Sequence, residues 1–143
     1  MADGMGSRDV TERLRARLSD SPFHTWLGVG VVEASEGWVR LGLEAQQQHL
    51  NLQGLVHGGL LATLADTAMG LAIRTSVEPD RRHVTIALHV QFLRPGRPGR
   101  IEASGQAVRV GRSVGHAEAT LVDDRGRELA RAQGTYSVTP LPG

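Results

Sequence analysis

The sequence predicts an α+β fold in which an antiparallel β-sheet curls around one long central α-helix. Three observations lead to this fold class. A single long apolar segment, residues 58–74, has helical periodicity, whereas six other segments are extended or strand-like, and several of these alternate with the two-residue period of half-buried strands. Turn sequences rich in glycine and charge separate several of these segments. Because a lone helix needs a sheet to cover it and a sheet needs one face covered, the two are expected to share one core.

Length and composition indicate one globular domain. The chain has 143 residues, of which 40% are hydrophobic and 22% charged, and its formal net charge is +1. Residues 1–8 are polar and rich in glycine, so they are expected to be a disordered N-terminus, with residues 9–143 forming the single domain. The charge balance gives no reason to expect a nucleic-acid partner.

Several classes of chemistry are excluded by what the sequence lacks. It has no cysteine, which rules out disulfides, cysteine-ligated zinc and thiolate nucleophiles. Its histidines have no metal-ligand spacing, and no P-loop, nucleophile-elbow or dinucleotide fingerprint is present, so neither a metal nor a cofactor is expected. The N-terminus has no signal-peptide core, and no apolar run is long enough to cross a membrane. The protein is therefore expected in the cytoplasm, with no membrane partner.

The first third of the chain is expected to hold a short helix and a hairpin. Apolar residues recur every four positions over residues 9–19, which predicts an amphipathic helix. A connecting segment then leads to an extended segment at residues 28–35. Glu36-Gly37 turns the chain back into residues 38–45, whose apolar positions alternate, so these two segments are expected to pair as a hairpin.

The long helix lies between a polar connection and a run of four strands. The connection is "QQQHLNLQGLVHGG", and the loop "SVEPDRRH" follows the helix. The strands are expected at residues 84–92, 100–110, 113–122 and 128–138. The first of them alternates strictly, with its apolar side chains on one face: Val84, Ile86, Leu88, Val90 and Phe92. The last two are joined by "DDRGR", a strong turn signal.

One carboxylate of the long helix lies away from its apolar face. At about 100° per residue, the leucines and Met69 fall in one broad sector. Asp66 falls on the opposite, narrower stripe, which also holds Gly59, Thr63, Thr67, Gly70 and Arg74. A solvated face would explain this stripe. Long helix-favouring residues are usual on solvated faces, however, and glycine costs helix stability, so a close approach by substrate or a second subunit is favoured.

The start of the same helix offers donors for an oxyanion. His57-Gly58-Gly59 allows an unusual backbone turn, and the first N–H groups of a helix have no internal partner. Together with the positive end of the helix dipole, these N–H groups can polarise a carbonyl oxygen. The combination of "HGG" with an isolated acid further along the helix is more specific for catalysis than either feature alone.

Other polar residues are weaker candidates by themselves. Asn51, six residues before His57, is of a type common in turns. Thr85 lies on the polar side of the strand predicted at residues 84–92, where threonine is favoured by propensity alone.

The segment "NLQGLVHGGLLATLADTAMG" resembles the signature of hotdog-fold thioesterases of the PaaI type, with Asn51, His57, Gly58, Gly59 and Asp66 in the pattern. The resemblance extends from about residue 22 to residue 139 and includes "FLRP" and the closing "VRVGRSVGHAEATLVDDRGRELARAQGTY". It implies a sheet wrapped around a helix, a homodimer paired sheet edge to sheet edge, and dimers that commonly associate into homotetramers. It also implies active sites at the dimer interface.

The resemblance further implies a role for each matching residue. The backbone N–H of Gly58 would polarise the thioester carbonyl of an acyl-CoA, while His57 would shape the turn and hydrogen-bond near the sulfur. Asp66, from the other subunit, would be the general base for water or the direct nucleophile. Asn51 would position the water or the carboxylate, and Thr85, a looser match, would assist the water.

Substrate contacts are expected at three further positions. Gly59 and Thr63 share the stripe with Asp66, and Arg112, within "VGRSVGH", is the arginine expected at the phosphates of CoA. An aspartate at position 66 separates the chain from the 4-hydroxybenzoyl-CoA thioesterases that use glutamate there. The acyl group stays open between aromatic groups, such as phenylacetyl and its hydroxylated derivatives, and medium-chain fatty acyl groups.

Two other functions stay open beside acyl-CoA hydrolysis. Hydratases or dehydratases of acyl thioesters share the fold, but they place a catalytic histidine with the acid and usually lack this spacing from "HGG" to the aspartate. A non-catalytic acyl-CoA-binding protein would need no ordered acid on the helix. The presence of Asp66 therefore favours the hydrolase.

Overall fold

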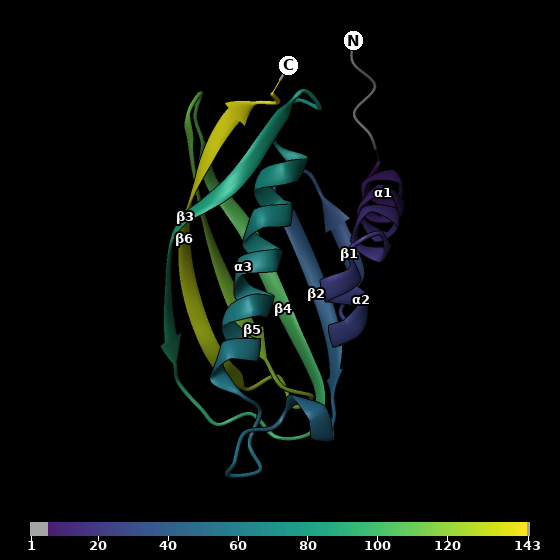
Figure 1. Ribbon diagram of the computed structural model, residues 1–143, viewed down its shortest axis with the longest axis vertical. Coiled ribbons are helices and arrows are strands. Elements are labelled where there is room, and N and C mark those ends of the chain that lie inside the picture. Colours follow the sequence, from purple (N-terminus) through teal and green to yellow (C-terminus); the bar gives the residue numbers. More distant parts are fainter. Residues whose placement is uncertain (1–5, 143) are drawn as a thin grey trace.

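The computed structural model describes residues 6–142, which form a six-stranded sheet around a central helix (Figure 1). The helical elements are α1 (Ser7–Ser19), α2 (Pro22–Leu27), the short 3-10 helix η1 (Gln47–His49) and the central α3 (Gly58–Thr75). The strands are β1 (Gly30–Ser35), β2 (Trp38–Ala45), β3 (Arg81–Phe92), β4 (Gly99–Val110), β5 (Val114–Val122) and β6 (Glu128–Pro140). The predicted α+β architecture is confirmed.

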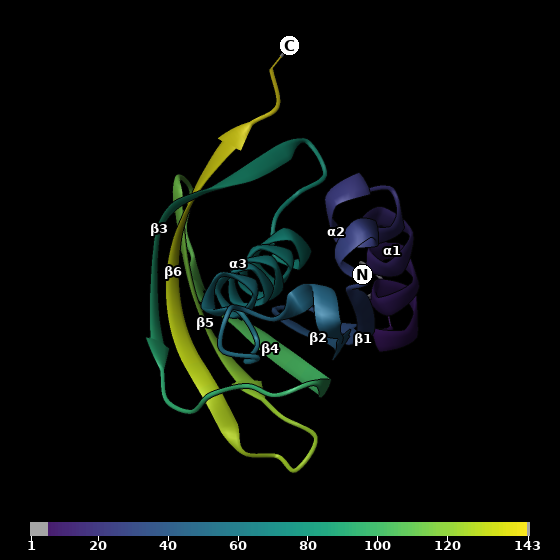
Figure 2. The same ribbon diagram turned by 60° about the horizontal axis from the view of Figure 1, so that its bottom comes forward.

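The sheet bends around α3, so that one face packs on the helix and the other faces away (Figure 2). Its strand order is β1-β2-β4-β5-β6-β3, and every neighbouring pair is antiparallel. The apolar sector predicted for the helix is buried against this face, together with inward side chains of the sheet such as Leu41, Ile101 and Leu121. Within residues 6–142, no helix is long and apolar enough to cross a membrane.

The two hairpins predicted from turn residues are present, and their turns have the expected conformations. β1 and β2 are joined at Glu36-Gly37, where Gly37 has a φ of 78°, a conformation that glycine adopts without steric cost. The turn between β5 and β6 is held by Asp123, whose carboxylate accepts hydrogen bonds from the backbone N–H groups of Arg125 and Arg127, both at 2.9 Å.

Two segments near the N-terminal end differ from the sequence-based expectation. α2 was not predicted; Ser21 caps it by accepting a hydrogen bond from the N–H of His24, Pro22 starts it, and Gly28 ends it in a left-handed conformation. α1 begins at Ser7 rather than at residue 9, because the Ser7 hydroxyl donates to the carbonyl oxygen of Ala34. Residues 7 and 8 are therefore helical and not disordered, and residues 1–5 of the predicted disordered segment lie outside the described residues.

β3 begins three residues earlier than predicted and is an edge strand. It pairs with β6 from Arg81 onward, so the expected loop is shorter. Its alternation is interrupted by a register shift between Thr85 and Ala87. Of the apolar residues predicted to share one face, several are well exposed: Val84 is 53% exposed, Ile86 59% and Phe92 56%. The edge strand thus presents an apolar surface that its own chain does not cover.

Among the glycines of the sheet, Gly105 of β4 lies closest to the backbone of α3. A Cβ at this position would lie 2.4 Å from the carbonyl carbon and oxygen of Ala68. Backbone atoms cannot rotate away, so an added methyl group must push the helix from the sheet. We expect Gly105→Ala to lower the free energy of unfolding by about 3 kcal/mol, the upper end of the usual cost of overpacking, as measured by urea denaturation. The control is Gly30→Ala, because nothing lies within 4 Å of a Cβ built at Gly30. Equal losses for both variants would contradict this explanation.

Candidate active site

Asp66 lies in a pocket of about 470 Å³ between α3, the two N-terminal helices and the paired strands β3 and β6. We call it the Asp66 pocket. The Oδ1 atom of Asp66 accepts hydrogen bonds from the Thr85 hydroxyl at 2.8 Å and from the Tyr136 hydroxyl at 2.9 Å. No group within residues 6–142 donates a hydrogen bond to Oδ2. One carboxylate oxygen is therefore fixed in place, and the other is free to accept a proton or to attack a carbonyl.

The pairing of β3 with β6 positions both donors. Thr85 and Tyr136 are directly opposite each other in the register of these strands. The Tyr136 side chain is 1% exposed, and its hydroxyl also lies 3.1 Å from the backbone carbonyl oxygen of Asp66. A rigid, buried side chain therefore holds the carboxylate in one orientation.

The tyrosine and the two histidines beside Asp66 are neutral at pH 7. Burial, and then the negative charge of Asp66, raises the pKa of Tyr136, so its hydroxyl keeps its proton. Burial and the charges of nearby arginines lower the pKa of His83 to about 4. Burial also lowers the pKa of His24. The carboxylate thus has neutral polar groups beside it and forms no ion pair within residues 6–142, although the cation Arg17 also lines the pocket.

The small-residue stripe is covered in part by strands of the same chain. A Cβ at Gly70 would lie 3.1 Å from Nε2 of His83 and 3.6 Å from the Tyr136 ring. Gly70 is buried, so β3 and β6 of the same chain make a close approach at this position, and Gly70 also lines the Asp66 pocket. The Thr67 hydroxyl is hydrogen-bonded to Nε2 of His24 at 2.9 Å, so α2 closes another side of the Asp66 pocket.

At the start of α3, one backbone N–H is left without an acceptor. His57 caps the helix, with its Nδ1 accepting a 2.8 Å hydrogen bond from the N–H of Gly59. The neutral ring then carries its proton on Nε2, which leaves that donor available. The N–H of Gly58 has no acceptor within residues 6–142. It is therefore the free donor of this turn, as the sequence predicts.

Gly58 lies in a second pocket, of about 330 Å³, which we call the Gly58 pocket. The ring of Phe92 packs over it, 3.4 Å from where a Cβ on Gly58 would be. Asn51 also lines this pocket. Its Oδ1 accepts hydrogen bonds from the backbone N–H groups of Gln53 and Leu55, at 2.9 and 3.1 Å, so it holds the turn that its residue type indicates.

The expected substrate contacts are in different places. Gly59 is exposed beside the Gly58 pocket, and the Thr63 hydroxyl donates to the carbonyl oxygen of Gly59 at 2.9 Å. Arg112 is exposed in the turn between β4 and β5 and lines neither the Gly58 pocket nor the Asp66 pocket. Within one chain, the structure therefore does not bring Arg112 to the candidate site.

Gly58 and Asp66 are also separated within one chain. They are eight residues apart on α3, which corresponds to a rise of about 12 Å along the helix. Reacting atoms must approach to about 3–3.5 Å. A carbonyl bound to the N–H of Gly58 is therefore out of reach of the Asp66 carboxylate of the same chain.

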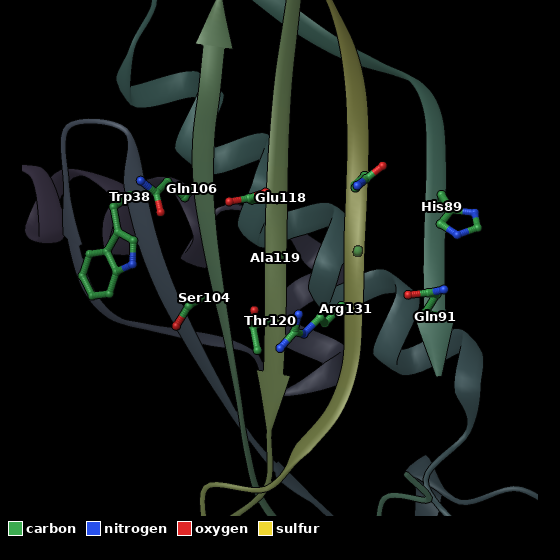
Figure 3. Close-up of a pocket in the computed structure, with 11 residues that line it drawn as sticks. Trp38, His89, Gln91, Ser104, Gln106, Glu118, Ala119, Thr120 and Arg131 are labelled. Atoms are coloured by element: carbon green, nitrogen blue, oxygen red, sulfur yellow. The ribbon is translucent and has the colours of Figure 1, made fainter. Parts of the chain in front are cut away.

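A third hollow, of about 400 Å³, lies on the outer face of the sheet (Figure 3). Polar side chains from five strands point into it, including Trp38, Gln106, Glu118, Arg131 and His89. This hollow is on the opposite face of the sheet from α3, so it is separate from Asp66 and Gly58. In the part of the chain that the structure describes, no group of three or more histidine, aspartate or glutamate side chains could hold a metal ion.

Sequence reasoning missed the residues that hold and surround Asp66. Tyr136 is the only tyrosine of the chain, and a polar ring on the buried face of a strand was the one available signal. His24 and His83 gave no signal, because their positions beside Asp66 depend on α2 and on the early start of β3.

Tyr136→Phe removes one of the two hydrogen bonds to Asp66 and leaves the ring. We expect kcat of the reaction at Asp66 to fall by about tenfold with little change in KM, because the carboxylate loses its fixed orientation. The pH profile of kcat should also shift, which loss of packing alone would not produce. Unchanged kcat in a correctly folded variant would show that Tyr136 does not position Asp66.

Comparison with known proteins places this geometry in a family. Residues 53–130 match the model of the thioesterase superfamily. A putative esterase from Halobacterium salinarum is 37% identical over 146 residues, which cover 94% of this chain and 96% of that protein. The chain therefore belongs to the thioesterase superfamily. It is a thioester hydrolase with the hotdog fold, and the family resemblance seen in the sequence is confirmed.

Two relatives from Escherichia coli have more specific names. The structure is similar to that of the PaaI protein from the phenylacetic acid degradation operon, with a TM-score of 0.84, 25% identity and coverage of 96% of both chains. The medium/long-chain acyl-CoA thioesterase YigI is 29% identical over 132 residues, covering 82% of this chain and 85% of YigI.

Proposed function

We propose that the protein hydrolyses acyl-CoA thioesters to the free acid and CoA. The observation that supports this most directly is Asp66, whose Oδ1 is fixed by two donors while Oδ2 is free beside an open pocket. The names of PaaI and YigI support two substrate classes, which are aromatic acyl groups such as phenylacetyl or hydroxyphenylacetyl and medium-chain fatty acyl groups.

The site requires two copies of the chain. The rise of about 12 Å between Gly58 and Asp66 prevents one chain from supplying both to the same carbonyl. The exposed apolar residues of the edge strand β3 are suited to a second copy, because an unpaired strand edge is a template for pairing. A homodimer in which each site takes Gly58 from one protomer and Asp66 from its partner satisfies both facts. The family resemblance implies that two such dimers associate into a homotetramer. The mass of the native protein in solution tests whether it is a dimer or a tetramer.

In the proposed mechanism, the N–H of Gly58 hydrogen-bonds the carbonyl oxygen of the thioester and stabilises the negative charge that develops there. Oδ2 of the partner's Asp66 takes a proton from water, and the resulting hydroxide attacks the carbonyl carbon. The C–S bond then breaks, and the CoA thiolate leaves with the Nε2–H group of His57 near the sulfur. The proton that Asp66 took from water passes to the thiolate or to solvent, which restores the carboxylate. Thr85 orients Asp66 and the water, while Asn51 shapes the turn before the helix. No metal or further cofactor takes part.

The free oxygen of Asp66 is equally suited to direct attack, which would give a mixed anhydride that water then hydrolyses. A single turnover in ¹⁸O-labelled water, repeated with hydroxylamine present, distinguishes the two routes. Label in the Asp66 carboxylate, or an Asp66 hydroxamate formed by trapping the anhydride, indicates the nucleophilic route. Label confined to the released acid, with no Asp66 hydroxamate, indicates the general-base route.

The function is tested by a panel of acyl-CoA substrates and a thiol reagent. Phenylacetyl-CoA, hydroxyphenylacetyl-CoA, octanoyl-CoA and decanoyl-CoA cover the two proposed classes. Release of thiol from one class with a higher kcat/KM identifies the acyl preference. If no member of the panel released thiol, acyl-CoA hydrolysis would be wrong for this protein.

A further inference from the structure

Three arginines surround a hollow of about 200 Å³ between α1 and the C-terminal end of α3. Arg13 and Arg17 extend from α1, and Arg74 lies in the last turn of α3. The remaining wall is mostly apolar and comes from Leu14, Thr75, Val77 and Pro79. Figure 2 shows α1 beside the open side of α3, away from β3 and β6. We call this the arginine hollow.

The three positive charges have no acidic partner in the part of the chain that the structure describes. None of the ion pairs within residues 6–142 includes Arg13, Arg17 or Arg74. The Arg74 guanidinium instead donates to the backbone carbonyl oxygens of Val77, Glu78 and Arg81. These carbonyls fix its position without cancelling its charge.

The charges of the three arginines act on one another and on their surroundings. Burial lowers the pKa of Arg74, and the neighbouring charges of Arg17 and Arg13 lower it further. The charges of Arg74 and Arg17 also add to burial in lowering the pKa of His83. A concave surface of like charges with apolar walls concentrates the field and attracts ions of the opposite sign. The hollow is therefore suited to an anion.

The arginine hollow lies next to the Asp66 pocket, because Arg17 lines both. Asp66, Gly70 and Arg74 are spaced four residues apart, so they follow one another along the same side of α3. The rise from Asp66 to Arg74 is about 12 Å. A ligand that reacts at Asp66 and extends along the helix therefore reaches the arginines with its far end.

We propose that the arginine hollow binds an anionic group of the substrate at a distance from the reacting thioester. The proposal rests on the proposed thioesterase function. Two groups have the required chemistry: a phosphate of the CoA nucleotide, and a carboxylate at the far end of the acyl group. Guanidinium groups bind both by charge-assisted, often bidentate, hydrogen bonds. On this proposal the anion contact lies at Arg13 and Arg17, and not at Arg112.

The test variant is Arg13→Gln combined with Arg17→Gln, because both side chains are exposed on α1 and substitution leaves the core intact. The matched control is Arg8→Gln combined with Arg125→Gln, which removes the same amount of positive charge. Both arginines are exposed, and neither lines the Asp66 pocket, the Gly58 pocket or the arginine hollow. The substrates are octanoyl-CoA, suberyl-CoA, which adds a terminal carboxylate, and octanoyl-pantetheine, which lacks the nucleotide.

A phosphate contact predicts that KM of the test variant rises about tenfold for both CoA substrates, which is the scale of one charge-assisted hydrogen bond. KM for octanoyl-pantetheine should then be unchanged. A carboxylate contact predicts the same rise for suberyl-CoA alone. The control should match the native protein throughout. No rise for any substrate, or an equal rise for octanoyl-pantetheine, would overturn the proposal.

Binding of CoA and of free suberate by isothermal titration calorimetry tests the hollow without any turnover. Weaker binding of either anion to the test variant than to the control supports the site. Equal binding to both contradicts it. If the native protein hydrolysed none of the substrates but still showed this difference in binding, the proposed function would be wrong and the anion site would stand.

Discussion

Asp66→Ala is expected to lower kcat for acyl-CoA hydrolysis by at least about 10²-fold, the scale of losing a positioned base. The variant removes the free Oδ2 together with the Oδ1 that Thr85 and Tyr136 hold. Asp66→Asn should lose nearly as much activity, because an amide neither accepts the proton of water nor attacks a carbonyl. Steady-state kinetics with the best acyl-CoA of the panel measures both variants.

The control is Glu118→Ala, which removes a carboxylate from the outer face of the sheet (Figure 3). Its kcat should equal that of the native protein. A near-native rate in Asp66→Ala, with an unchanged melting temperature, would disprove the role of Asp66 while leaving the fold and the family intact.

Gly58→Pro is expected to lower kcat by about 10²–10³-fold, the usual effect of removing one oxyanion donor. Proline has no N–H, yet it fits the first position of a helix, and the preceding His57 already has the extended backbone that proline requires, with φ −60° and ψ 129°. The helix should therefore form normally, and circular dichroism and thermal unfolding check that it does.

Gly58→Ala is the matched control, because it adds a Cβ beside Phe92 but keeps the N–H. A loss as large as that of Gly58→Pro would assign the effect to crowding and not to the donor. Mixing Asp66→Ala chains with Gly58→Pro chains then tests the shared site, since half of the dimers contain one intact site. About a quarter of the native activity should return after random exchange of subunits, and none should return if each chain forms its own site.

Periodicity and turn chemistry are sufficient to predict most of this fold. Residues 58–74 show the helical period so clearly that the helix ends within one residue of the prediction, and β2 has the predicted bounds. Both are regular in pattern, and a glycine marks the start of each, Gly58 in α3 and Gly37 directly before β2, which is where local sequence has most influence. The free N–H of Gly58 also follows from local sequence, because a helix start leaves its first donors unpaired.

The surroundings of Asp66 could not be predicted in this way. Tyr136 is 70 residues from Asp66 along the chain, and it meets the carboxylate only because β6 packs against α3. Gly70 shares a helical stripe with Asp66, but periodicity cannot show that His83 covers it. The three arginines of the hollow come together because α1 packs beside α3, which composition does not reveal. Contacts distant in sequence depend on tertiary structure rather than on local pattern.

The exposed apolar edge of β3 makes newly synthesised chains prone to aggregation. In the proposed homodimer a second copy covers this edge, so a newly made chain that is still monomeric presents an unpaired strand with Val84, Ile86 and Phe92 at the surface. Such an edge recruits any strand it encounters, and self-association into insoluble material competes with correct assembly. Variants that weaken pairing of β3 with a second copy should therefore accumulate mainly as aggregated protein. The specific activity of the protein that stays in solution would then underestimate the effect of the substitution on assembly.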